Sequence, residues 1–139
     1  MVMLNERRRR LKTMRTVFDQ GEWLTAEQIN ARQKRPPANR SQPASDWKRR
    51  GRVYSVTFDG RAYFAAYQFD TACQPLPVIR EILAALGPVA ETGKIAAWFH
   101  FPNGWISAEL TQAVAPKDAL DRPLEVIGAA RRNIGSYVG

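Results

Sequence analysis

The chain has 139 residues, of which 45% are hydrophobic and 24% charged, the balance of a globular protein rather than a disordered one. A single cysteine excludes an intrachain disulfide and a zinc site built from cysteines, and it fits a reducing compartment. No apolar stretch reaches the ~18 residues of a membrane span, so we expect a cytoplasmic protein that does not cross a membrane.

The net charge of +8 is concentrated at the front of the chain. Residues 1–61 hold 15 Lys and Arg against 6 Asp and Glu, whereas residues 62–139 hold 6 against 7. A cationic segment of this kind is typical of proteins that bind a polyanion such as nucleic acid. The nearly neutral second segment needs a different function.

The first twenty residues predict a helix that ends at Gly21. Apolar residues recur there at helical spacing: Leu4, Leu11, Met14 and Phe18. The remaining faces are basic and contain Arg7 to Arg10, Lys12 and Arg15. Three interpretations stay open: a solvated helix surface, a basic arm that contacts phosphate, and a disordered start of the first few residues.

A second helix has a strong start signal. Thr25 as N-cap and Gln28 three residues later form a capping box. Leu24 and Ile29 stand at the two positions of a hydrophobic staple. The helix should run to about residue 32 or 33, because prolines at positions 36 and 37 then prevent its continuation.

A third helix is expected before Gly51, with Asn39 or Ser41 as its cap and Pro43 in its first turn. Ala44 and Trp47 are three residues apart and should face inward. Polar and basic residues then share the outer side, the arrangement that places a helix in the DNA major groove. Asp46 on this helix would repel phosphate unless it pairs with a neighbouring arginine.

Asp59-Gly60 between two apolar runs predicts a two-residue β-hairpin. Pairing Phe58 with Arg61 places Val56 opposite Tyr63 and Tyr54 opposite Ala65. We interpret the hairpin as the wing of a winged helix-turn-helix, with a purely structural hairpin as the alternative. The candidate DNA-binding residues are Arg40, Ser41, Gln42, Ser45, Lys48, Arg49, Arg50, Arg52 and Arg61.

A turn-rich link near Asp70 predicts a boundary between a DNA-binding domain at 1–69 and a helical domain at 70–139. Helices are expected over 77–86 and 93–100, the second capped by Thr92. A third should begin at Trp105, with Ile106 and Leu110 on its apolar face, and Pro116 should start a short turn. The last helix should have Asp121 as its cap and an apolar face of Leu124, Ile127 and Ile134. The expected fold is thus mainly α with one β-hairpin, a winged helix-turn-helix followed by a small helical domain.

Four aromatic residues lie within eight positions of this second segment: Trp98, Phe99, Phe101 and Trp105. A helical unit of about 60 residues can scarcely bury all four, so part of the cluster should form a surface patch. Tryptophan is a frequent anchor of protein interfaces.

We find no pattern that indicates catalysis, a metal site or a cofactor. His100 is the only histidine and is interpreted as structural. Cys73 has no accompanying base and is interpreted as an ordinary small residue. An enzyme is therefore not expected.

The segments PLPVIREILAAL and KIAAWFHFPNGWI, together with a Pro-x-x-x-Leu turn and an Ala-rich last helix, resemble the toxin-binding domain of Xre/MbcA/ParS antitoxins. The matching positions are Trp98, Pro102-Asn103, Ile106, Pro116 and Leu120, with the QFD entry at 68–70 and Pro75. The resemblance covers about residues 53–134.

The resemblance implies an antitoxin, or a regulator descended from one, that binds a RES-type or related toxin and its own promoter. The candidate partner-binding residues are Trp98, Phe101, Asn103, Trp105, Arg131 and Arg132. Two features depart from the family pattern: the longer segment SAELTQAV, and a front half closer to a winged helix than to a five-helix Xre unit. We favour a homodimer. The alternative function is an interaction scaffold with only non-specific affinity for nucleic acid.

Overall fold

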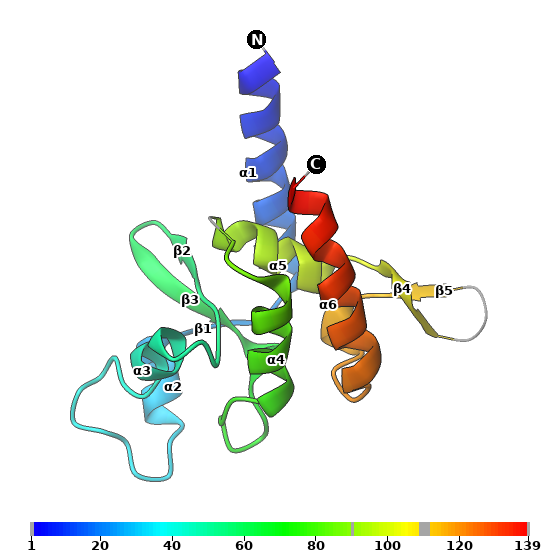
Figure 1. The fold of residues 1–139 in the computed structure, drawn as a ribbon. Helices are drawn as coiled ribbons and strands as arrows, with labels where there is room; N and C mark the ends of the chain where they lie inside the picture. Colours follow the sequence, from blue (N-terminus) through cyan, green and yellow to red (C-terminus); the bar gives the residue numbers. More distant parts are fainter. Residues whose placement is uncertain (1, 90, 109–111, 139) are drawn as a thin grey trace.

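A computed structural model describes residues 2–89, 91–108 and 112–138 of the chain. The fold is α+β and contains two small sheets (Figure 1). The elements in chain order are α1 (Val2–Gln20), β1 (Trp23–Thr25), α2 (Ala26–Ala31), α3 (Ala44–Arg49), β2 (Val56–Phe58), β3 (Arg61–Ala65), the 3-10 turn η1 (Ala66–Gln68), α4 (Pro77–Leu86), α5 (Thr92–His100), β4 (Asn103–Ala108), β5 (Gln112–Val114), the 3-10 turn η2 (Pro116–Asp118) and α6 (Pro123–Val138).

The predicted hairpin forms with the predicted register near its tip. Val56 pairs with Tyr63 and Phe58 with Arg61. The turn residues Asp59 and Gly60 have φ of 54° and 74°, as a type I′ turn requires. This sheet has a third strand that the sequence reading missed, because β1 pairs antiparallel with β3 to give the order β1-β3-β2.

The predicted pairing of Tyr54 with Ala65 does not form, because β2 begins only at Val56. The side-chain amide of Gln68 occupies that place instead. Its Oε1 accepts from the Tyr54 N–H at 2.8 Å and its Nε2 donates to the Tyr54 carbonyl at 3.0 Å. Gln68 is fully buried, so a side chain substitutes here for a neighbouring strand.

The predicted start of α2 is confirmed, whereas the predicted caps of α3 are not. The capping box of α2 is present, with Gln28 N–H donating to Thr25 Oγ1 at 3.2 Å and Thr25 N–H to Gln28 Oε1 at 2.8 Å. The predicted caps of the next helix are wrong, since α3 begins after Pro43 without a side-chain cap. The Asn39 carboxamide binds Ser41 in a local turn instead.

The expectation of an all-helical second segment is wrong. α4 forms with the predicted ends, and α5 begins at Thr92 with Glu91 rather than Thr92 as N-cap. The predicted helix at Trp105 is strand β4, in which Trp105 is exposed and Ile106 buried. Leu110, the third residue of that predicted face, lies outside the described residues. Mainly α with one hairpin is thus corrected to α+β with two hairpins.

One hydrophobic core joins the two segments of the chain. It combines Val17 of α1, Tyr54 and Val56 at the root of the hairpin, and residues of α4, α5 and α6. The ring of Phe99 stacks on that of Tyr54 with centroids 5.5 Å apart. A smaller cluster lies beneath α2, α3 and β3. The division into two domains at residue 69 stays a prediction. Residues on both sides of that position pack into one hydrophobic core.

The apolar face predicted for the last helix is right for Ile127, which is partly buried and packs against the core, and wrong for Leu124. The buried residues of this helix are small, Val126, Ala129 and Ala130, and they let α6 pack closely against α4. Leu124, expected on the apolar face, is 88% exposed. The side chain of Ile134 lies outside the described residues.

Candidate functional site

The third helix has the inner and outer faces that its spacing predicts. Ala44 and Trp47 are buried, whereas Ser45, Lys48 and Arg49 are exposed. The buried pair packs into the smaller cluster and fixes the rotation of the helix. The helix therefore displays a polar and basic face to solvent.

Asp46 pairs with Arg49 of the same helix and with Arg50, the residue that follows the helix. Arg49 donates to Asp46 Oδ1, and Arg50 Nε lies 3.4 Å from Oδ2. The arginine side chains are 75% and 68% exposed, so these pairs add little to stability. Asp46 was expected to repel phosphate unless it paired with a neighbouring arginine, and the structure shows such pairs with two of the candidate DNA-binding arginines.

The long connection between α2 and α3 is held by one buried amide. Asn30 is only 8% exposed. Its Nδ2 lies 2.9 Å from the carbonyl oxygen of Pro37, 3.2 Å from that of Asn39 and 2.8 Å from that of Gln42. This contact positions the exposed residues Arg40, Ser41 and Gln42. Asn30 was not among the predicted residues, since no spacing rule marks a side chain that binds a distant loop.

The remaining candidate cations flank the hairpin. The Arg52 guanidinium carbon lies 5.8 Å from the Trp47 ring centroid, at the end of α3. Arg61 is exposed and pairs with Phe58 next to the turn. Figure 1 shows α2, α3 and the β2–β3 hairpin on the same side of the molecule. The candidate DNA-binding residues thus belong to adjoining elements.

The partner-binding candidates divide into surface and core. Trp105 is 61% exposed and Phe101 40%. The Arg132 guanidinium carbon stands 4.0 Å from the Trp105 ring centroid, and Arg131 is exposed beside it in α6. The Asn103 carboxamide oxygen accepts from the Trp105 N–H at 2.9 Å.

Trp98 differs from Trp105, because it is half-buried and packs edge-on against Phe99 at 5.1 Å. The Trp98 indole N–H is buried, with no hydrogen-bond partner among the described residues. Trp98 therefore contributes mainly to the core, and Trp105 and Arg132 form the exposed part of the candidate partner surface. Figure 1 shows the β4–β5 hairpin at the opposite end of the molecule from α2 and α3.

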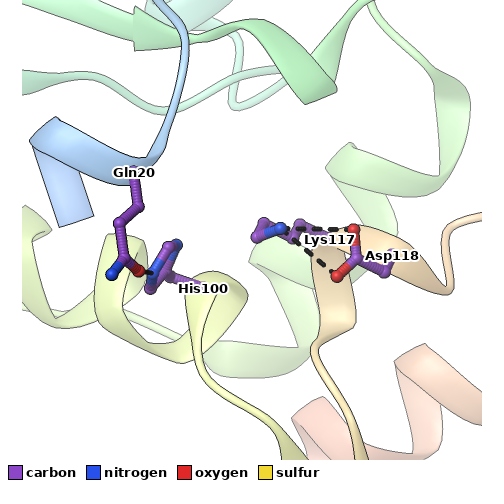
Figure 2. Close-up of polar contacts among 4 residues, drawn as sticks. All are labelled: Gln20, His100, Lys117 and Asp118. Carbon is purple, nitrogen blue, oxygen red and sulfur yellow. Dashed lines mark hydrogen bonds and ion pairs between the residues drawn. The ribbon is translucent and has the colours of Figure 1, made fainter. Parts of the chain in front are cut away.

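A pocket of about 360 Å³ lies where α1, α5 and η2 meet. His100 Nε2 is 2.8 Å from Gln20 Oε1, so the imidazole donates from Nε2, and Lys117 Nζ is 3.2 Å from both carboxylate oxygens of Asp118 (Figure 2). Burial lowers the pKa of His100, and Lys117 lowers it further. The hydrogen bond ties α5 to the end of α1, a structural contact.

The described residues were also searched for a reactive cysteine, a metal site and a membrane-spanning helix. Cys73 is 5% exposed, and burial raises the pKa of its thiol. Across residues 2–89, 91–108 and 112–138, no group of three or more His, Cys, Asp or Glu side chains is arranged to hold a metal ion. None of the helices in these ranges combines the length and apolar character needed to cross a membrane.

Comparison of the chain with protein-family models, with curated proteins and with solved structures finds no match.

Proposed function

We propose that the chain is a DNA-binding regulator whose N-terminal part is a winged helix-turn-helix. The observation that carries the proposal is the exposed basic face of α3 together with the cations at the hairpin. The order of elements supports it: a helix, a short strand, two helices and a hairpin whose second strand pairs with the short one. In such an arrangement α3 reads the major groove and the hairpin contacts the backbone.

The partners of the basic residues differ in the proposed complex. Gln42, Ser45 and Arg49 are the side chains able to reach base edges. Arg40, Lys48, Arg50, Arg52 and Arg61 bind phosphates. If about five cations meet phosphates, the logarithm of the affinity falls by ~4.5 per tenfold rise in salt.

Selection of bound sequences from a random DNA pool tests the proposal directly. An enriched sequence, bound with a steep salt dependence and weakened by Arg49→Ala, is the expected result. A pool without enrichment would favour the alternative, a scaffold with only non-specific affinity. A charge-neutral control is Thr57→Ala, which removes an exposed side chain from the hairpin without changing its charge.

Asp46 offers a second test of opposite sign. Because it pairs with Arg49 and Arg50, Asp46→Asn frees both guanidinium groups and removes a negative charge near the bound phosphates. We expect DNA affinity at low salt to rise about three- to tenfold, an electrostatic gain of roughly 0.7–1.4 kcal/mol. An unchanged or weaker affinity would mean that this face does not approach DNA.

We further propose that the β4–β5 and α6 surface binds a protein partner, as the resemblance to antitoxins implies. The exposed Trp105 under the Arg132 guanidinium has the composition of an interface anchor. The proposed partner is a RES-type toxin, and the regulator would repress its own promoter. Trp105→Ala should abolish neutralisation of such a toxin and leave DNA binding intact, whereas Arg49→Ala should do the reverse. Simultaneous loss of both activities in a folded variant would refute two separate surfaces.

A further inference from the structure

A third surface, besides the two candidate interfaces, lies between α1 and the β2–β3 hairpin. It is a groove of about 660 Å³ whose third wall is the start of α5. The apolar side chains that line it are Leu11, Met14, Phe18, Val56 and Phe58. The rings of Phe18 and Phe58 lie 5.3 Å apart. The groove is therefore walled by apolar groups from two elements far apart in the sequence.

Two of these side chains are exposed although their positions suggest burial. Leu11 is 69% exposed and Phe58 57%. Leu11 lies on the same helical face as Met14 and Phe18, both of which pack against the core. Figure 1 shows that the first turns of α1 extend beyond the rest of the fold. Exposed apolar surface of this kind marks an interaction site.

The charge around the groove restricts what can occupy it. Five cations of α1 are exposed: Arg7, Arg8, Arg9, Lys12 and Arg15. Among the described side chains of α1 only Glu6 and Asp19 oppose them, and the charged side chains that line the groove itself are Arg15, Asp19 and Glu91. Two copies of α1 packed together would place like charges side by side, which disfavours a second copy. A lipid bilayer is flat and cannot enter a concave groove, whereas a helix can.

We propose that this groove binds an acidic amphipathic helix of a partner protein. Its apolar side chains would cover Leu11 and Phe58, and its Asp and Glu residues would lie beside the α1 arginines. The contact uses none of the candidate DNA-binding residues, and its Phe58 is the strand partner of one of them, Arg61. The evidence for it is the groove itself and does not depend on the function proposed above.

A designed peptide is the probe. It has ~18 residues, about five helical turns, with Leu at i, i+3, i+4 and i+7 and Glu at the other positions. Binding of the fluorescent peptide to the full-length chain is measured by anisotropy. We expect saturable binding, and no binding by the peptide in which every Glu is replaced by Lys. Each of Leu11→Ser and Phe58→Ser should weaken binding about tenfold, because each removes an apolar side chain that the peptide buries.

The control variant is Leu124→Ser, which removes an apolar side chain that is 88% exposed on α6. It should leave peptide affinity unchanged, and circular dichroism of all three variants verifies that they fold. Equal binding by a peptide with Glu but without Leu would overturn the proposal, since charge alone would then suffice. A dimer in sedimentation that Leu11→Ser dissociates would assign the groove to a second copy. Binding of phosphatidylglycerol vesicles that depends on Leu11, without peptide binding, would assign it to a membrane.

Discussion

Removing the Asn30 side chain should loosen the connection between α2 and α3. The amide nitrogen carries two hydrogens and faces three carbonyl oxygens, so Asn30→Ala loses about two effective hydrogen bonds. At roughly 0.5–1.5 kcal/mol each, the free energy of unfolding should fall by about 1–3 kcal/mol. Urea denaturation of the full-length chain measures this change.

The local effect is measured by limited trypsin digestion. Arg40 is exposed and lies between two of the carbonyl groups that Asn30 binds. Mass spectrometry should show faster cleavage of the Arg40–Ser41 bond in Asn30→Ala than in the native chain, because local opening of the loop needs less free energy. Affinity for DNA should fall as well, since the loop carries candidate contacts.

Gln33→Ala is the matched control for this experiment. Its Nε2 donates to the Ile29 and Cys73 carbonyls, both at 3.1 Å, and so ties the start of the connection to α2 and to the turn before α4, not to the residues around Arg40. Gln33→Ala should lower stability by a similar amount without faster cleavage after Arg40. Equal cleavage rates in the two variants would refute the role assigned to Asn30.

Three further predictions concern the core and the partner surface. Gln68→Ala leaves the buried N–H and carbonyl of Tyr54 without partners, so urea denaturation should show a loss of about 2–4 kcal/mol, whereas a loss below about 1 kcal/mol would contradict that role. Burial raises the pKa of Tyr54 and Tyr67 above their ordinary value. The unfolded tyrosines ionise near pH 10 while the folded pair stays protonated, so stability should be lost as pH rises above about 10, and a constant urea midpoint up to about pH 11 would disprove it. Trp98→Ala should lower stability by about 2 kcal/mol or more, whereas Trp105→Ala should change it by less than about 1 kcal/mol and affect only partner binding.

Local signals predicted those parts of the fold that depend on a few neighbouring residues. The capping box at Thr25 and the turn at Asp59-Gly60 were predicted from the sequence because each contains its own hydrogen bonds or backbone requirement. Strand β1 was missed because its three residues become a strand only by pairing with β3, about forty positions away. β4 was mistaken for a helix because one apolar residue between two exposed ones is too short to show a period of two.

The sequence predicted which residues of the candidate site are exposed, but it did not predict the contacts that hold the neighbouring loop in place. Lys48 and Arg49 lie on the exposed face of α3, as the spacing of Ala44 and Trp47 predicted. The loop that precedes them depends on Asn30, whose partners are carbonyl groups that no sequence pattern specifies. Leu124 was placed on the wrong face, because a buried stripe of alanines carries almost no hydrophobic signal.

The stacking of Tyr54 on Phe99 has a practical consequence for genetic dissection of this protein. Cutting the chain after residue 69 would separate Tyr54, in the first fragment, from Phe99, in the second. Each fragment would then expose aromatic surface that is buried in the intact chain. Such fragments should aggregate when expressed alone. The activities of residues 1–69 and 70–139 are therefore better separated by single substitutions in the intact chain than by deletion of either part.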